Sequence, residues 1–301
     1  MLRQACSRHR HTGLQLVALS VAALSLATAC ATPVEHVRSM AVEHGLSHEL
    51  RRGDDFEHLL IAGNAPDAWR EYGPPLTIYV DHDGRPWVGG TRVARDPSPR
   101  DPLALRLMLR ALEHPRAAGL GAGTQDAPAL YVGRPCHFGA GPADACHPLL
   151  WTHARYAEAV VASMATAIED WIAARGGTVS DRHPAVVLVG YSGGGTLAVL
   201  LAARLPRTIA VVTIAANLDV AAWAGHHRYS PLAGSLDPAR QPPLPPAVAQ
   251  WHFVGARDEV VPGKLQAGYL RRNPGARQIE VQDQDHVCCW RSLWPALLPV
   301  P

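Results

Sequence analysis

The fold of this chain is decided by Pro184–Val189 (PAVVLV) and the residues that follow it, Gly190–Gly194 (GYSGG). Pro184–Val189 is a short, apolar, β-branched run bounded by a proline, which predicts a buried parallel strand. Gly195–Arg204 (GTLAVLLAAR) then predicts a buried helix. Between them, Gly190–Gly194 fits the pattern G-x-S-x-G, in which small residues permit a sharp, strained turn that exposes the serine hydroxyl. The stretch makes Ser192 a candidate nucleophile, and the plainer alternative is an ordinary glycine-rich turn.

Apolar runs and helical segments alternate on both sides of this stretch. Strands are expected at 58–61, 76–80, 130–132, 209–214, 251–254 and 279–281, and helices at 103–112, 153–174, 262–271 and 290–298. Strands separated by helices predict the α/β class, with a doubly wound, mostly parallel sheet flanked by helices. Sheets of this kind carry their sites at the carboxyl ends of the strands.

Composition bounds the partners that the chain can have. Its 301 residues are 48% hydrophobic and 18% charged, so it can bury a substantial core. The net charge is +2 without a basic block, which argues against nucleic acid as the main partner. The 16 histidines are scattered and show no clear zinc-binding spacing, so no metal site is expected.

The first 29 residues have the pattern of a secretory signal peptide. Arg3, Arg8 and Arg10 precede the uncharged apolar stretch 14–29, which is short for a membrane-spanning helix. Residues 26–30 (LATAC) resemble a bacterial lipobox, and this predicts a lipid on Cys30 and an anchor facing the periplasm. The alternative is ordinary cleavage before Cys30, which would release a soluble periplasmic or secreted protein.

One folded domain is expected after the signal peptide. Residues 30–55 are polar and ambiguous and are expected to form a tether, with the domain spanning 56–301. Within it, the long, proline-containing stretch 217–249 is either a surface excursion or a small cap over the site.

Four cysteines lie in the expected domain, and export to an oxidising compartment favours their oxidation. Cys136 and Cys146 flank a short loop that can fold back, and a disulfide between them would stabilise the fold by roughly 2–3 kcal/mol. Cys288 and Cys289 are adjacent, and their sequence leaves open whether they bond to each other or elsewhere.

A serine nucleophile needs a base to accept its proton and an acid to orient that base. In this architecture the chain order is serine, acid, histidine. Asp258 follows the expected strand 251–254, with Glu259 a weaker competitor and Asp219 the rival acid. His286 is the only histidine after Asp258, so the order selects it as the base.

Acyl transfer also needs donors for a developing oxyanion. The backbone N–H of Gly193, directly after the serine, is one candidate. The second is expected in the loop 81–87 after the strand 76–80, where Asp83 and Gly84 have backbone N–H groups to offer.

From about residue 56 to residue 298 the chain resembles the α/β-hydrolases. The resemblance is carried by GYSGG at 190–194, by Asp258 and by His286. The loop His82-Asp83-Gly84-Arg85 departs from the common His-Gly pattern of the family. Together with residues 131–136 (YVGRPC), it is similar to a group of exported bacterial α/β-hydrolases with which we associate no defined substrate.

The resemblance implies a serine hydrolase that cleaves a carboxylic ester of a small molecule through an acyl-enzyme, without a metal or organic cofactor. Ser192 would attack, His286 would carry the proton and Asp258 would orient His286. A peptidase or amidase with the same three residues is the nearest alternative. A non-catalytic envelope lipoprotein that keeps the fold for binding is a more distant one. Contact with a membrane is expected only through the N-terminal anchor.

Overall fold

An eight-stranded sheet forms the centre of the protein, in the order β1-β2-β6-β3-β7-β8-β9-β10. The computed structural model describes residues 31–70, 73–114, 127–141, 145–177 and 183–298. The strands of the sheet are β1 (Ser47–Arg52), β2 (Glu57–Gly63), β3 (Leu76–Val80), β6 (Ala129–Val132), β7 (Val186–Tyr191), β8 (Thr208–Ile214), β9 (Ala249–Gly255) and β10 (Arg277–Val281). β2 runs antiparallel to both β1 and β6, and every other neighbouring pair is parallel.

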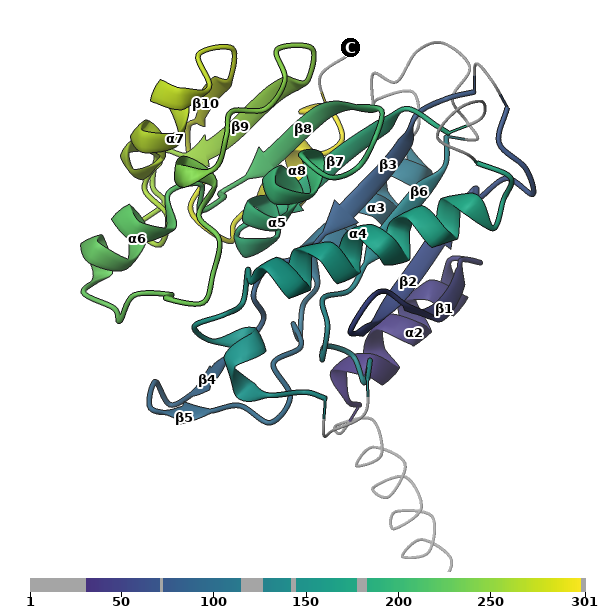
Figure 1. Cartoon of the computed structure of the whole chain (residues 1–301), viewed down its shortest axis with the longest axis horizontal. Coiled ribbons are helices and arrows are strands. Elements are labelled where there is room, and N and C mark those ends of the chain that lie inside the picture. Colours follow the sequence, from purple (N-terminus) through teal and green to yellow (C-terminus); the bar gives the residue numbers. More distant parts are fainter. Residues whose placement is uncertain (1–30, 71–72, 115–126, 142–144, 178–182, 299–301) are drawn as a thin grey trace, which may run out of the picture.

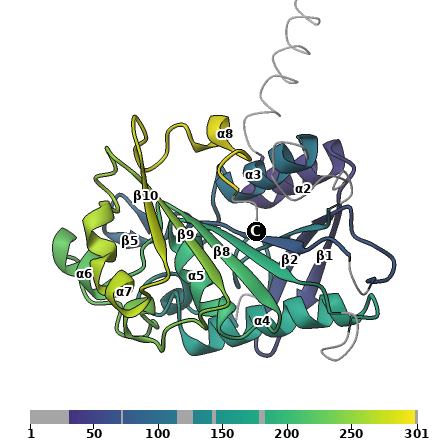
Figure 2. The ribbon, with the colours of Figure 1, turned by 90° about the horizontal axis from the view of Figure 1, so that it is seen from above.

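Helices cover both faces of the sheet, as Figure 2 shows from above. One face carries α2 (Pro33–Glu43), α3 (Leu103–Glu113) and α8 (Trp290–Leu293), and the other carries α4 (Glu158–Ala173), α5 (Gly193–Ala202), α6 (Val220–His227) and α7 (Ala267–Arg272). The described residues also form three short 3₁₀ turns, Pro148–Trp151, Pro238–Arg240 and Gly263–Gln266. The expected α/β fold class with a mostly parallel sheet is confirmed.

The central strand β7 is fully buried because both of its faces are covered. Leu188 points into the apolar core beneath α4 and α5, and Val189 points into the core beneath α3 and α8. A strand buried on both faces reads as a continuous apolar run rather than as an alternating one. This is why PAVVLV predicts the middle of the sheet so clearly.

The N-terminal boundary differs from the expected tether over residues 30–55. α2 packs Val37 and Met40 into the core, and β1 pairs with β2 from Ser47 opposite Ala62 onward. Residues 33–52 therefore belong to the sheet domain. β1 lacks the apolar pattern that predicts a strand, because it is a polar edge strand whose residues are mostly exposed.

Further differences concern a hairpin, the stretch 217–249 and the bounds of two helices. Trp87–Val88 (β4) and Arg92–Val93 (β5) form a small hairpin that short runs of this length do not predict. The stretch 217–249 contains the helix α6 and a 3₁₀ turn, and Figure 1 shows α6 and the hairpin on the same side of the molecule. The expected helix 290–298 is only α8, and the expected helix 153–174 begins at Glu158.

The predicted signal peptide and Cys30 lie outside the described residues. Among the residues that the structure describes, none lies in a helix that is both long enough and apolar enough to cross a bilayer.

Three of the four buried histidines among the described residues make the folded state sensitive to acid. Burial lowers the pKa of His58 and His137 to about 4 and that of His252 to about 3. In the unfolded chain each would titrate near 6.5, so below that pH the unfolded state binds protons that the folded state does not. The stability contributed by the neutral histidines is complete above about pH 6.5 and is lost as the pH falls towards about 4.

We predict that His252→Met makes stability less dependent on pH. His252 alone should account for about 2 kcal/mol of the decrease in the free energy of unfolding between pH 7 and pH 5. The variant is expected to be less stable at pH 7, because the Thr213 hydroxyl loses its hydrogen bond to the His252 Nδ1 atom, 2.8 Å away. Urea unfolding at both pH values measures the difference, with the exposed His48→Met as the matched control. An unchanged difference in the His252→Met protein would contradict the prediction.

Candidate active site

Ser192 lies on a strained turn between β7 and α5. Its backbone has φ 53° and ψ −123°, and its N–H donates to the Ile214 carbonyl oxygen at 2.9 Å. The turn is possible because Gly190 and Gly194, two residues before and after the serine, have no side chains. A Cβ atom on Gly190 would lie 2.3 Å from the Gly194 carbonyl oxygen, and one on Gly194 would lie 2.1 Å from the Val80 carbonyl oxygen. The sequence pattern thus corresponds to a turn that presses directly on β3.

The structure brings together the three residues proposed for catalysis, from the ends of three strands. Ser192 Oγ lies 3.0 Å from His286 Nε2, and His286 Nδ1 lies 2.9 Å from Asp258 Oδ2. A carboxylate only accepts hydrogen bonds, so Nδ1 carries the proton and Nε2 is free to accept one from the serine hydroxyl. The arrangement can therefore remove the proton from Ser192 as its oxygen attacks an electrophile.

The Asp258 carboxylate is held by the turn that follows β9. Its Oδ1 atom accepts hydrogen bonds from the N–H groups of Val260 and Val261, at 2.9 and 2.7 Å. The side chain is 0% exposed. Asp219, the rival acid, instead accepts from the Ala222 N–H at the start of α6, and Glu259 is exposed. Asp258 is thus the acid that faces His286.

The loop that carries His286 is ordered by its neighbours. The Tyr191 hydroxyl donates to the His286 carbonyl oxygen at 2.8 Å. Asp285, although exposed, accepts from the N–H groups of Val287 and Cys288. These contacts fix the backbone on either side of the imidazole. Within this loop Cys288 is bonded to Cys289, and elsewhere Cys136 is bonded to Cys146.

The expected oxyanion donors differ in whether their N–H groups already have a hydrogen-bond partner. The Gly84 N–H donates to His82 Nδ1 at 3.2 Å inside its own loop, so it is not free for a ligand. The N–H of Gly193 opens α5, where no helical partner exists. Within the described residues, the N–H groups of Asp83 and Gly193 have no hydrogen-bond partner. Asp83 and Gly193 therefore remain the candidate pair.

The side chain of Asp83 forms a buried ionic cluster beside the serine. It accepts hydrogen bonds from Arg134, from Arg155 at 2.8 Å and from the Tyr156 hydroxyl at 2.8 and 3.0 Å. Burial opposes its ionisation, but the two guanidinium charges hold the pKa of Asp83 well below its usual value. A Cβ on Gly193 would lie 2.1 Å from Asp83 Oδ1, so the carboxylate packs against the turn of Ser192.

Sequence reasoning did not find the partners of Asp83. Arg155 and Tyr156 directly precede α4 and belong to no motif, and Arg134 appears only within the segment 131–136. One feature of the sequence could have identified them. All three are polar residues at strand or helix ends, and these ends lie at the edge of the sheet where the serine was expected.

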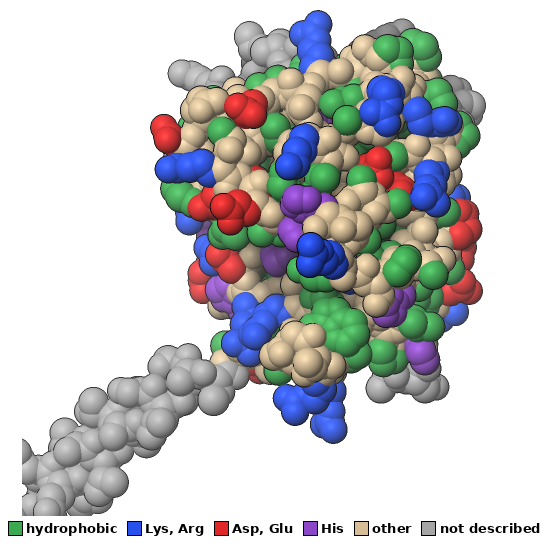
Figure 3. Space-filling view, turned by 90° about the vertical axis from the view of Figure 1, so that its left-hand side faces the viewer, with side chains coloured by type: hydrophobic (Ala, Val, Ile, Leu, Met, Phe, Trp, Pro, Cys, Tyr) green, Lys and Arg blue, Asp and Glu red, His purple; other side chains and the backbone are tan. Residues whose placement is uncertain are grey.

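A cavity of about 490 Å³ opens over Ser192 and His286. Its walls include the loop 82–86, Arg100, Leu103, Trp223 of α6 and Val260. Figure 3 views the face of the molecule at which the parallel strands end. Histidine side chains lie near its middle with Lys and Arg close by, and Asp and Glu lie mostly towards the sides.

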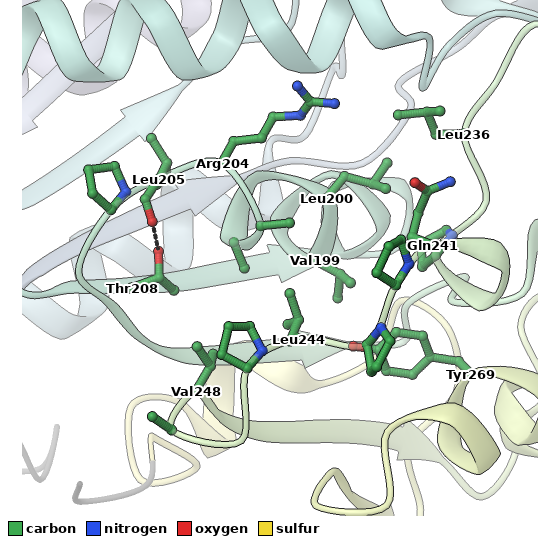
Figure 4. A pocket seen from close by; sticks show the side chains of 18 of the residues that line it. Val199, Leu200, Arg204, Leu205, Thr208, Leu236, Gln241, Leu244, Val248 and Tyr269 are labelled. Carbon is green, nitrogen blue, oxygen red and sulfur yellow. Dashed lines mark hydrogen bonds between the residues drawn. The ribbon is translucent and has the colours of Figure 1, made fainter.

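A larger cavity, of about 720 Å³, lies elsewhere. Figure 4 shows it between α5 and the proline-rich stretch before β9, with Leu200, Leu244 and Tyr269 on its walls. It contains none of the residues predicted for the site, and its lining is mainly aliphatic and proline side chains. Size alone therefore does not identify the site in this protein.

A second serine–histidine pair lies away from the strand ends. His58 Nε2 is 2.9 Å from Ser163 Oγ, and His58 Nδ1 is 3.1 Å from the Gly133 carbonyl oxygen. Both residues are 0% exposed, and this histidine faces a carbonyl rather than a carboxylate. The pair satisfies buried polar groups between β2 and α4 and is closed to a substrate.

We predict that Gly194→Ala destabilises the protein by about 1–3 kcal/mol, because the new methyl group must displace the backbone of β3. The matched control is Gly225→Ala in α6, where a Cβ meets nothing within 4 Å. That control should leave stability unchanged or raise it, by up to about 1 kcal/mol. Urea unfolding of the three proteins measures both effects, and equal stability of the two variants would refute the close contact at β3.

Comparisons with known proteins bear on the fold. No protein-family model and no curated protein matches the chain. Among solved structures it is similar to an α/β serine hydrolase homologue from Coxiella burnetii, with 11% identity, a TM-score of 0.52, and coverage of 84% of this chain and 95% of that one. It is also similar to an esterase from Pyrococcus furiosus, with 9% identity, a TM-score of 0.49, and coverage of 83% and 84%.

The similarity to the Coxiella burnetii structure extends over most of this chain and nearly the whole of the other. The mostly parallel sheet flanked by helices and the turn between β7 and α5 agree with the architecture that the sequence predicts. The chain therefore has the α/β-hydrolase fold.

Proposed function

We propose that this protein is a serine hydrolase that cleaves a carboxylic ester. The observation that supports the proposal is the hydrogen-bonded series Ser192–His286–Asp258 at the floor of an open cavity. The N–H groups of Asp83 and Gly193, which have no partner among the described residues, lie in the loop after β3 and directly after the serine. A nucleophile, a base, an acid and two donors are the parts that acyl transfer needs.

In the proposed reaction, Ser192 Oγ bonds to the ester carbonyl carbon while its proton passes to His286 Nε2. The carbonyl oxygen takes up the negative charge and accepts hydrogen bonds from the N–H groups of Asp83 and Gly193. The carbon–oxygen bond to the alcohol then breaks, and His286 gives its proton to the leaving oxygen. Water attacks the acyl-serine by the same steps and restores the free hydroxyl.

Each surrounding residue has a task in this scheme. Asp258 keeps the proton on His286 Nδ1 and stabilises the imidazolium that forms. The Asp83 side chain, tied to Arg134 and Arg155, fixes the loop that offers the second N–H. Fixed donors need no rearrangement as charge develops, which is the main source of their effect on rate.

We predict that Ser192 is the residue labelled by a fluorophosphonate probe. Purified protein should be labelled at one site, and Ser192→Ala should abolish labelling and lower kcat/KM for p-nitrophenyl acetate by at least about 10³-fold. Ser163→Ala is the matched control and should still be labelled, because that serine is buried. Folded wild-type protein that resists the probe would refute the proposed function. A parallel panel of aminoacyl amides measures whether ester cleavage is preferred.

A second prediction separates Asp258 from its rival. Asp258→Asn should lower kcat by about 10⁴-fold, because an amide favours the wrong tautomer of His286. Asp219→Asn, which changes only the cap of α6, should leave kcat within about twofold. If the Asp219 variant lost the activity and the Asp258 variant kept it, the assignment of the acid would be reversed.

A further inference from the structure

We propose that a groove beside the Ser192 cavity binds an aromatic acyl group of the ester. This inference rests on the proposed function, because it assigns a part of the substrate to a place in the structure. The groove has a volume of about 490 Å³ and is enclosed by the β4–β5 hairpin, the start of the segment after α6 and the turn before α4. We call it the aromatic groove, after Trp87, His153, Trp223 and Tyr229 in its walls.

The aromatic groove adjoins the cavity over the serine. Pro86, Arg155 and Trp223 line both spaces. A substrate whose carbonyl carbon lies at Ser192 can therefore extend into the groove without leaving the protein surface. The charged member of this shared wall, Arg155, is already paired with Asp83 and is almost fully buried, so the passage suits an apolar group.

The rings of the groove are exposed and yet held in place. Trp87 is 37% exposed and Tyr229 is 56% exposed, which is high for large apolar side chains. The Trp223 indole N–H donates to the Val260 carbonyl oxygen at 2.9 Å, and His227, which lies 2.8 Å from the same oxygen, stacks on Tyr229. Exposed apolar surface that is fixed next to a site marks a binding surface more often than a packing fault.

Aromatic walls favour an aromatic occupant. Trp223 and Tyr229 already meet edge to face with ring centroids 5.3 Å apart, and Trp87 meets His153 in the same way at 6.5 Å. A ring that enters the groove can make the same kind of contact with either pair. Each such contact contributes about 0.5–1.5 kcal/mol beyond the burial of area.

The position of His286 decides which half of the ester enters the groove. His286 must reach the leaving oxygen to protonate it, so the alcohol lies on the side of His286 and Val287. Neither residue lines the aromatic groove, which meets the cavity at Pro86, Arg155 and Trp223. Arg155 binds the Asp83 side chain, so the groove begins beside the loop that carries Asp83. The geometry therefore assigns the groove to the acyl half.

The test compares esters that share the p-nitrophenyl leaving group and differ in their acyl half. The wild-type protein should prefer the 3-phenylpropanoyl ester to the acetyl ester in kcat/KM. Trp87→Ala should lower kcat/KM for the 3-phenylpropanoyl ester by about tenfold and for the acetyl ester by less than about twofold. Val88→Ala is the matched control, because Val88 lies on the same hairpin with similar exposure and does not line the groove.

Two further substrate series make the proposal falsifiable. An equal loss for the 3-cyclohexylpropanoyl ester would contradict an aromatic occupant. A loss that appears for 2-phenylethyl acetate relative to ethyl acetate, but not in the acyl series, would assign the groove to the alcohol and overturn the proposal. Equal kcat/KM of the wild-type protein for the acetyl and 3-phenylpropanoyl esters would overturn it as well.

Labelling of Ser192 by the fluorophosphonate probe separates this proposal from the one on which it rests. Wild-type protein that is labelled but shows no acyl preference would refute the aromatic groove alone. Wild-type protein that is not labelled would refute the proposed function itself. Labelling of Trp87→Ala at the wild-type extent shows that the variant is folded with its nucleophile intact.

Discussion

The close approach of the β7–α5 turn to β3 is the contact on which the site depends. The turn can press on β3 only because Gly194 leaves room for the Val80 carbonyl oxygen. That contact sets the distance between Ser192 and the loop after β3, where Asp83 lies. A wider turn would keep the serine and move it away from the candidate donor. Tight packing of backbone on backbone is thus the basis of the site's geometry.

The parts that sequence predicts well are those fixed by topology. Parallel strands end at one edge of a sheet, so residues that follow such strands meet there whatever their separation along the chain. This is why His286, chosen by chain order, lies within hydrogen-bond distance of both Asp258 and Ser192. The glycines around the serine predict the strained turn equally well, because few other residues fit such a turn.

The parts that sequence predicts poorly depend on contacts between distant segments. β1 is a polar edge strand, so it lacks the apolar pattern that identifies β7. The Asp83 cluster joins the ends of β3 and β6 to the turn before α4, and none of its spacings repeats along the chain. The aromatic groove is likewise made by a hairpin and a post-helical segment that meet only in the folded protein. Such contacts can be explained from the folded structure, but no local periodicity in the sequence predicts them.

The Asp83 cluster has an electrostatic consequence. It contains one carboxylate and two guanidinium groups, so its formal charge is −1 + 2 = +1. Arg134 and Arg155 are shielded from water, with side chains 3% and 9% exposed, and their excess charge is therefore only weakly screened. Carboxylates lie close by as well: Asp81, Asp258 and Asp285 act electrostatically on Tyr191, next to Ser192, so the +1 charge belongs to the cluster and not to the site as a whole. Within the proposed mechanism, Arg134 and Arg155 would offset part of the repulsion that these carboxylates exert on a negative oxygen above Ser192.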